Sequence, residues 1–249
     1  MKRARYLRLV ALCLSDGGVG FSSGTKYIHF TNQSPILLDL FKKEIRKFSN
    51  SKIHKQIKER GITLRVFDKN LVKNLLEISP NFRTKPVDHH PVNRKIQEIT
   101  TLNGIKYPKI RIPNDIFISK RDKSEFLRIY ASCDGYPSIF PRKYSWSAVE
   151  RIVAIVAQHP IIKKRISELL TEFDINHKIK MSGVFMRSRE AIIKYKENIG
   201  FVDGVRMTGN SKFWKGVTKN KVLDIISKSY DIKFPSKDKS DVLRVLKSV

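Results

Sequence analysis

One arrangement of residues occurs twice in the sequence, and this internal repeat constrains the fold more than any other feature. At a constant offset of 125 residues, the stretch 30–37 aligns with the stretch 155–162. The identical pairs include Gln33 with Gln158 and Pro35 with Pro160. Both stretches pass from a β-rich run through polar residues to a proline, which suits the first turn of a helix, and then to an amphipathic helix. We therefore expect two copies of one structural unit.

An apolar helix that ends in Asp-Gly precedes each copy, at residues 9–17 (LVALCLSDG) and 127–135 (LRIYASCDG). Apolar and small side chains allow two such helices to pack side by side, which brings Asp16 and Asp134 together at their C-terminal ends. Two neighbouring carboxylates repel each other unless a divalent cation neutralises them, and that combination can activate water for hydrolysis. A single Asp-Gly is usually only a helix stop, but two at equivalent places in a repeat favour a metal site.

The hydrophobic periodicity predicts the same order of elements in each copy. The first copy is expected to contain helices at 5–16, 35–48 and 70–78 and strands at 19–22, 26–32 and 62–67. The second copy is expected to contain helices at 123–133, 161–172 and 190–199 and strands at 136–140, 149–157 and 177–187. This mixture of helices and short strands predicts two half-domains of the α+β class.

Composition divides the chain into four expected parts. They are a first half-domain (1–85), a linker (86–120), a second half-domain (121–207) and a C-terminal extension (208–249). The linker contains four prolines and little helical periodicity, so we expect it to be extended. The C-terminal part is rich in lysine and carries two amphipathic segments, 221–230 and 239–246, which predict a small basic helical extension.

The charge of the chain indicates a polyanionic partner. Fifty Lys and Arg residues against 23 Asp and Glu residues give a net charge of +27 and a sequence pI of about 10.2. Neutralising phosphates releases bound counterions, which drives association with nucleic acid. A membrane-surface protein would carry a basic amphipathic helix or a lipidation signal, and no apolar run approaches the roughly 18 residues of a membrane span.

The cysteine content favours a reducing environment. Cys13 and Cys133 are the two cysteines, and neither has a Cys or His neighbour at a zinc-ligand spacing. We expect both to be packed thiols in a cytoplasmic protein. The N-terminal residues do not form a signal peptide in this interpretation, because Arg8 interrupts the apolar stretch and no cleavage site of small residues follows.

The two Asp-Gly helices resemble the LAGLIDADG motif of homing endonucleases, in the single-chain, two-motif, archaeal-like form. The resemblance covers about residues 1–207, with Asp at the eighth motif position and Gly at the ninth in both copies. It implies two pseudo-symmetric αββαββα half-domains with curved antiparallel sheets that bind DNA and motif helices packed at the centre. Two positions depart from the pattern: the third is Ala11 in one copy but Ile129 in the other, and the sixth is Leu14 and Ser132.

The resemblance also implies an activity and its partners. A monomer of this kind, typically intron-encoded, binds a long asymmetric site in double-stranded DNA. It hydrolyses one phosphodiester on each strand with Mg²⁺, leaving short 3′ overhangs, and Mn²⁺ or Ca²⁺ can substitute for binding. Asp16 and Asp134 are the implied metal ligands, helped by the backbone carbonyls of Ser15 and Cys133.

Polar and basic residues beside the two acids complete the implied site. Asn32, Gln33 and Gln158 match positions that order water near the scissile phosphates, with Ala157 in the place of Asn32. Helix capping is an alternative role for both glutamines. Arg83 or Lys85 in the first half and Arg206 in the second match basic residues that stabilise charge on the phosphates. Solvated surface charge is the alternative for each of these three residues.

Recognition of DNA is expected on the strands, because alternate side chains of a half-covered sheet can enter the major groove. The expected contacts are Tyr27, His29 and Arg65 in the first half and Lys178, Lys180, Arg187 and Arg189 in the second. The strand expected at 149–157 is almost entirely apolar, so its alternation cannot be assigned from the sequence.

Two other functions fit the same fold. One is a non-catalytic DNA-binding regulator, and the other is an RNA-splicing maturase. Loss of either acid would favour the regulator, whereas the sequence keeps both Asp16 and Asp134. Double-stranded DNA cleavage is therefore the favoured interpretation.

Overall fold

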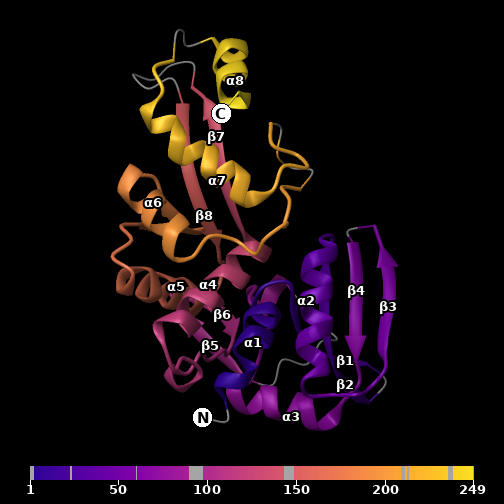
Figure 1. Ribbon diagram of the computed structural model, residues 1–249. Coiled ribbons are helices and arrows are strands. Elements are labelled where there is room, and N and C mark those ends of the chain that lie inside the picture. The colour runs from indigo at the N-terminus through magenta and orange to yellow at the C-terminus, as the bar shows by residue number, and fades with distance from the viewer. Residues whose placement is uncertain are drawn as a thin grey trace.

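The computed structural model describes residues 3–22, 24–59, 61–89, 98–142, 149–208, 211, 213–234 and 238–248. The first half-domain comprises α1 (Leu7–Leu14), β1 (Gly17–Ser22), β2 (Thr25–Asn32), α2 (Pro35–Arg46), β3 (Ile53–Lys58), β4 (Gly61–Val66) and α3 (Lys69–Ile78). The second comprises α4 (Lys120–Asp134), β7 (Gly135–Pro141), β8 (Val149–Val156), α5 (Pro160–Glu172), β9 (Lys178–Lys180), β10 (Gly183–Met186) and α6 (Arg189–Asn198). Both halves have the order αββαββα, which confirms the expected α+β architecture (Figure 1).

The two halves contain sheets of identical topology. Their strand orders are β1-β2-β4-β3 and β7-β8-β10-β9, and all neighbouring strands are antiparallel. The sequence missed β3, which lies at the edge of the first sheet and exposes five of its six residues. An exposed edge strand lacks the apolar alternation by which strands are recognised.

The helices that carry the two Asp-Gly motifs lie side by side at the centre of the molecule (Figure 1). All residues from Leu9 to Leu14 in α1 are 0% exposed, and the α4 residues Phe126, Leu127, Ile129 and Ala131 are also fully buried. The buried side chains of both halves belong to one hydrophobic core. The large Ile129 and the small Ala11 are therefore both accommodated within the interior.

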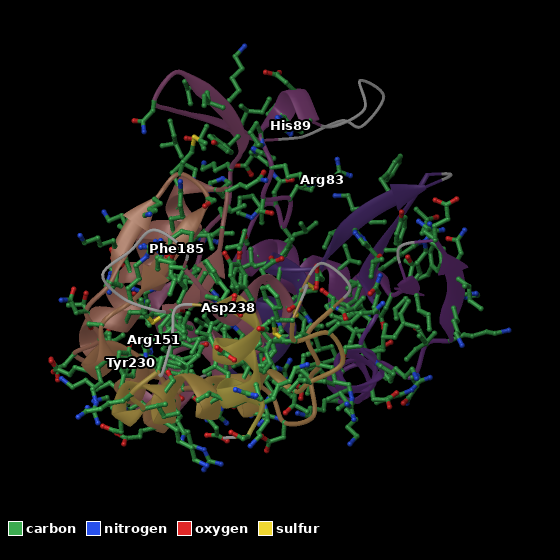
Figure 2. The ribbon with its side chains drawn as sticks, turned by 90° about the horizontal axis from the view of Figure 1, so that it is seen from above. Arg83, His89, Arg151, Phe185, Tyr230 and Asp238 are labelled. Carbon is green, nitrogen blue, oxygen red and sulfur yellow. The ribbon has the colours of Figure 1, made fainter. Side chains whose placement is uncertain are left out.

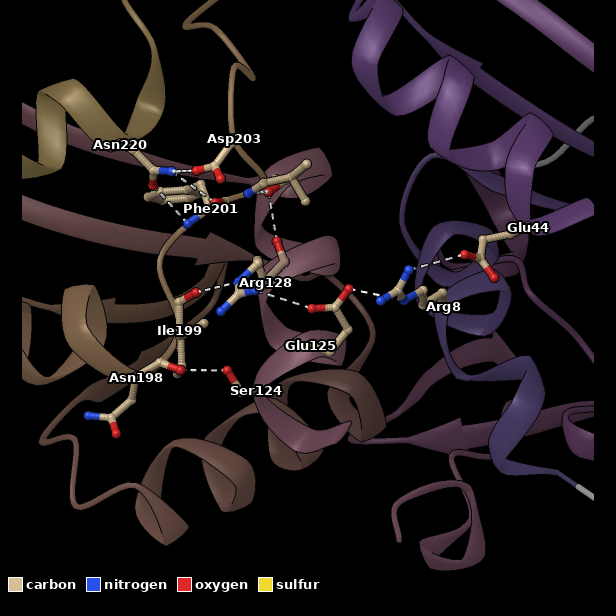
Figure 3. A network of polar contacts seen from close by, with 12 residues as sticks. Arg8, Glu44, Ser124, Glu125, Arg128, Asn198, Ile199, Phe201, Asp203 and Asn220 are labelled. Carbon is tan, nitrogen blue, oxygen red and sulfur yellow. Dashed lines mark hydrogen bonds and ion pairs between the residues drawn. The ribbon is translucent and has the colours of Figure 1, made fainter. Parts of the chain in front are cut away.

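A charged network spans the helix pair on one side (Figure 3). The Arg8 guanidinium of α1 lies 3.4 Å from a Glu44 carboxylate oxygen of α2 and 3.1 Å from one of Glu125 in α4. Arg128 continues the network, 3.3 Å from Glu125, and donates to the Ile199 carbonyl at 2.7 Å. Glu44 is 2% exposed, so loss of Arg8 would leave a buried carboxylate with less compensation.

The linker contains a β-hairpin that the sequence interpretation did not include. Strands β5 (Ile99–Leu102) and β6 (Ile105–Pro108) pair around Asn103 and Gly104, whose φ values are 52° and 76°. Asn-Gly suits a turn with two residues of positive φ, and this signal outweighs the nearby prolines. His159 at the start of α5 holds the hairpin, since its Nε2 lies 2.9 Å from the Pro108 carbonyl. Residues 90–97 of the expected linker lie outside the described part of the chain.

The C-terminal part carries the two expected helices, α7 (Lys219–Lys228) and α8 (Lys239–Lys247). It is packed into the second half, because Val222, Leu223 and Ile226 belong to the core. Figure 2 places Arg151 of β8 and Tyr230 close to α7, and the Arg151 guanidinium lies 4.4 Å from the Tyr230 ring centroid. Truncation at residue 208 would therefore open the interior of the second half.

The free edge of β7 is covered by the segment that leads into α7. The Trp214 indole donates to the Ile139 carbonyl at 2.8 Å, and Lys219 donates to the Gly135 carbonyl. An uncovered edge strand offers unpaired backbone groups to other chains, so this cover prevents edge pairing. Among the described residues, no helix is long and apolar enough to cross a membrane.

Gly183 is expected to tolerate no side chain. A Cβ at this position would lie 2.2 Å from the Ile155 carbonyl oxygen, and the backbone has a φ of 155°. Gly183→Ala should lower the free energy of unfolding by about 2–5 kcal/mol, measured by urea denaturation. Gly104→Ala is the matched control, because its φ is also positive but nothing lies within 4 Å. Equal losses for the two variants would contradict the close approach of β10 to β8.

Candidate active site

The site lies where α1 and α4 end. Asp16 follows α1 after one residue, and Asp134 is the last residue of α4. The Asp16 carbonyl accepts a hydrogen bond from the Thr31 amide at 2.9 Å, which ties this acid to the end of β2. A cavity of about 460 Å³ opens beside Asp134. Its lining includes Asn32, Ser34, Cys133, Asp134, Arg206 and Lys219, so both halves contribute to it.

The two acids share one electrostatic environment. Burial, together with the charge of Asp16, raises the pKa of Asp134 to about 8, although the charges of Lys219 and Lys85 oppose the rise. Burial also raises the pKa of Asp16, against the hydrogen bond from Asn32 and the charge of Lys219. Ionising both carboxylates is therefore unfavourable unless a cation joins them.

The donor atoms at the site suit a hard divalent cation. Among the described residues, no group of three or more His, Cys, Asp and Glu side chains could hold a metal ion. The two carboxylates provide hard oxygen donors of the kind that Mg²⁺ or Ca²⁺ prefers. The residues present thus fit a magnesium ion better than a zinc ion.

Asn32 is held directly against one acid. Its amide Nδ2 donates to Asp16 Oδ2 at 2.6 Å, while its Oδ1 accepts from the Ser34 amide at 2.7 Å. The equivalent position in the second half is Ala157, which has no polar side chain and is buried. The two acids therefore have different neighbours.

Gln33 and Gln158 do not cap the helices that follow them. Ser34 Oγ accepts from the Leu37 amide at 3.5 Å, and His159 Nδ1 accepts from the Ile161 amide at 3.2 Å. These neighbours are the N-caps of α2 and α5, while both glutamines are exposed. The capping alternative is therefore wrong for both glutamines.

The three basic residues expected near the acids occupy different places. Lys85 is exposed and its charge lowers the pKa of Asp134. Arg206 lines the cavity and donates to the Gly216 carbonyl at 2.5 Å. Its segment lies against the first half, because a Cβ at Gly204 would approach Ile36 to 2.4 Å. Arg83 lines a separate cavity of about 170 Å³ on the first sheet.

Lys219 is a site residue that the sequence interpretation missed. Its side chain is buried, and its ammonium donates to the Ser132 carbonyl at 2.7 Å and the Gly135 carbonyl at 2.6 Å. Burial lowers its pKa to about 8, opposed by the charges of Cys133, Asp134 and Asp16. A cation is thus built into the end of α4, where helix carbonyls lack partners. In the sequence, Lys219 is marked only by the preceding Thr218, which caps α7, and it is one of many lysines in this segment.

The residues next to the acids are part of the same local structure. Ser15 Oγ donates to the Ala11 carbonyl at 2.9 Å, so its hydroxyl turns back onto α1. Cys13 is fully buried and Cys133 half-buried, and burial raises the pKa of the Cys13 thiol to about 12. The expectation of packed, unpaired thiols is confirmed.

The expected recognition residues of the first half share one face of the sheet. Ile28 and Phe30 are 0% exposed on the core face. Tyr27 and His29 alternate with them, and Arg65 lies directly across from His29 in the strand register. The face that carries Tyr27, His29 and Arg65 is the open face, because α2 and α3 pack against the opposite face with its buried residues.

The expected contacts of the second half separate into two groups. Lys178 and Lys180 are exposed on β9. The Arg187 guanidinium lies 3.0 Å from a Glu150 carboxylate oxygen. Arg189, the first residue of α6, has its guanidinium 2.7 Å from a carboxylate oxygen of Asp231. Arg189 also approaches the Tyr230 ring, so it lies on the α7 side of the sheet. Arg189 therefore lies away from the open face that carries Lys178 and Lys180.

Comparison with known proteins supports the architecture. No family model and no curated protein matches this chain by sequence. Mesophilic variants of the homing endonuclease I-DmoI align over 79% of this chain and 90% of theirs, with 15% identity and a TM-score of 0.51. I-DmoI in complex with DNA and Mn aligns over 79% of this chain and 96% of its own, with 15% identity and a TM-score of 0.50.

A third similar structure is the N-terminal LAGLIDADG domain of DUF199/WhiA, with 13% identity and a TM-score of 0.46 over 84% of this chain and 85% of that one. The chain therefore has the fold of the homing endonuclease I-DmoI. The LAGLIDADG resemblance drawn from residues 1–207 is confirmed at the level of the fold.

The raised pKa of Asp134 predicts how the metal-free protein responds to pH. In the folded state the Asp134 carboxyl keeps a proton that it releases above about pH 4 in the unfolded state. The free energy of unfolding therefore falls as pH rises towards about 8. Asp134→Asn should raise Tm by several degrees at about pH 8.5 and much less at about pH 5, at roughly 2–4 °C per kcal/mol. Asp88→Asn, at an exposed carboxylate, is the control. A gain independent of pH would contradict the raised pKa.

Lys219 is expected to be essential to the stability of the site. Lys219→Met removes the donor from the buried Ser132 and Gly135 carbonyls and should lower the free energy of unfolding by about 2–5 kcal/mol. Lys215→Met, at an exposed lysine of the same segment, should stay within about 0.5 kcal/mol of wild type in urea denaturation. If both variants were equally stable, the buried ammonium would have no structural role.

Proposed function

We propose that the protein is a site-specific endonuclease that cuts both strands of double-stranded DNA as a monomer. The observation that carries this proposal is the pair of acids at the ends of two packed helices, where Asp16 contributes to the raised pKa of Asp134. A regulator that only binds DNA has no need for such an unfavourable pair. The similarity to I-DmoI, solved with DNA and Mn, supports the same class of partner.

Asp16 and Asp134 would hold Mg²⁺, with the carbonyls of Ser15 and Cys133 as further ligands. Bound Mg²⁺ lowers the pKa of water and stabilises charge on a phosphodiester. Mn²⁺ or Ca²⁺ could occupy the same oxygen ligands. Each acid would serve one strand, and the expected product carries short 3′ overhangs.

The other polar residues have distinct proposed roles. Asn32 fixes the orientation of the Asp16 carboxylate through its hydrogen bond. Gln33 and Gln158 are exposed beside the ends of β2 and β8 and would order water at the phosphates. Lys85 and Arg206 would offset negative charge that develops on the two phosphates. Arg83 belongs instead to the recognition surface of the first sheet.

The affinity for DNA would come mainly from charge. With a net charge of +27, the protein can contact many phosphates. Removing one Lys or Arg that binds a phosphate should reduce the slope of log affinity against log salt by roughly 0.9. Sequence would be read by the open faces of the sheets, through residues such as Tyr27, His29 and Arg65 in the first half and Lys178 and Lys180 in the second.

The two acids provide the test of this function. Asp16→Asn and Asp134→Asn should each slow linearisation of a supercoiled target plasmid roughly 100-fold or more in Mg²⁺, while DNA binding stays close to wild type. Candidate intron-insertion sequences supply the targets, and Asp88→Asn is the matched exposed control.

The rival functions give different results in the same assay. A DNA-binding regulator would retain the plasmid without cutting it at any Mg²⁺ concentration. An RNA-splicing maturase would promote splicing of an intron transcript in variants that no longer cut DNA. Wild-type cleavage by either Asn variant would overturn the proposed nuclease site.

A further inference from the structure

The open faces of the two sheets differ in chemistry although their strands correspond one to one. Equivalent positions correspond through the common order of strands and through the register of the two central strands in each sheet. The pairs are Thr31 with Val156, His29 with Ala154, Tyr27 with Ile152, and Arg65 with Phe185. At each pair a polar side chain in the first half is replaced by an apolar one in the second.

The first face is rich in hydrogen-bond donors. His29, Arg65 and His54 lie in one row across β2, β4 and β3. Arg65 also borders the cavity of about 170 Å³, together with Lys58 and Arg83, and no acidic residue lines it among the described residues. This half therefore offers several cationic donors and no acidic acceptor in one small space.

The rings of Tyr27 and His29 on this face lie against glycines in β1, which leave room for them. A Cβ at Gly20 would lie 2.5 Å from the Tyr27 ring, and one at Gly18 would lie 3.1 Å from the His29 ring. The Arg65 guanidinium lies 5.3 Å from the Tyr27 ring centroid, which positions the donor group above that ring. Arg65 is thus pre-positioned for a ligand.

The second face offers few donors. Tyr136, Ala154, Phe185 and Lys178 form one row across β7, β8, β10 and β9. Phe185 takes the place of Arg65. Arg187, two residues further along, lies 3.0 Å from a carboxylate oxygen of Glu150, which also pairs with Arg142. Glu150 is only 11% exposed, so its charge is directed at these two arginines. Figure 2 shows Phe185 farther from α7 than Arg151, in agreement with its place on the open face.

These two surfaces match different base edges in the major groove. Guanine presents two acceptors there, O6 and N7, which an arginine can bind with two hydrogen bonds. Thymine presents a methyl group, which apolar side chains contact. A donor-rich face therefore selects guanine, and an apolar face selects thymine.

We propose that the DNA site of this protein is chemically asymmetric, with guanine required opposite Arg65 in the half-site bound by the first sheet and thymine methyl groups required opposite Tyr136 and Phe185 in the other. This inference rests on the proposed binding of double-stranded DNA and adds the substrate class of each half-site. Arg65 is the specificity-determining residue of the first half. Arg187 of the second half is neutralised by Glu150 and reads no base.

Base analogues test this without altering the protein. Duplexes that bind the intact protein are selected from a random library in Ca²⁺, and the strongest site is synthesised with single substitutions. Replacing guanine by 7-deazaguanine removes the N7 acceptor and should weaken binding at least fivefold in one half-site only. Replacing thymine by deoxyuridine removes the methyl group and should weaken binding severalfold in the other half-site only.

A matched pair of variants assigns each half-site to its sheet. Arg65→Ala should weaken binding to the selected site by roughly 5-fold to 100-fold and remove the 7-deazaguanine effect. Arg187→Ala, at the arginine that pairs with Glu150 in the second half, should leave both analogue effects in place. Selection that returns no preferred sequence would overturn the proposed function and this inference together. A preferred site whose two halves respond alike to both analogues would overturn the inference alone.

Discussion

Two carboxylates held together at the ends of two packed helices are the constraint on which the rest of the structure depends. Asp16 and Asp134 can share one site only because α1 and α4 lie in contact, and that contact requires helices with few polar side chains. Through this helix pair, the buried residues of both half-domains form one hydrophobic core. Repulsion between the acids opposes this arrangement, and carboxylates perturbed in this way are concentrated at functional sites.

Cations supplied by the protein partly offset that repulsion. The Lys219 ammonium lies at the end of α4, where it satisfies two carbonyls and lowers the pKa of both acids. The segment that carries Lys219 is absent from the internal repeat, yet it also covers the edge of β7 through Trp214. The C-terminal part is therefore integral to the second half and to the site. This departure from symmetry, with Asn32 beside one acid alone, makes the two acids unequal.

Features governed by local pattern could be predicted from the sequence, whereas those set by long-range packing could not. The acids, the αββαββα order and the phase of Tyr27 and His29 follow from motifs and from alternation between buried and exposed residues. Lys219 escaped prediction because its partners lie 84 to 88 residues away in the sequence. Strand β8 could not be phased because its open face is apolar too, and that property is the basis of the asymmetric recognition inferred above.

The most direct test of the account is the pKa of the Asp134 side chain, measured by carboxyl NMR titration of the metal-free protein with and without Asp16→Asn. We expect a wild-type pKa near 8 that falls in the variant, because the substitution removes a neighbouring negative charge. A wild-type pKa near 4, unchanged by Asp16→Asn, would mean that the two carboxylates do not share a site, and the proposed nuclease centre would be contradicted.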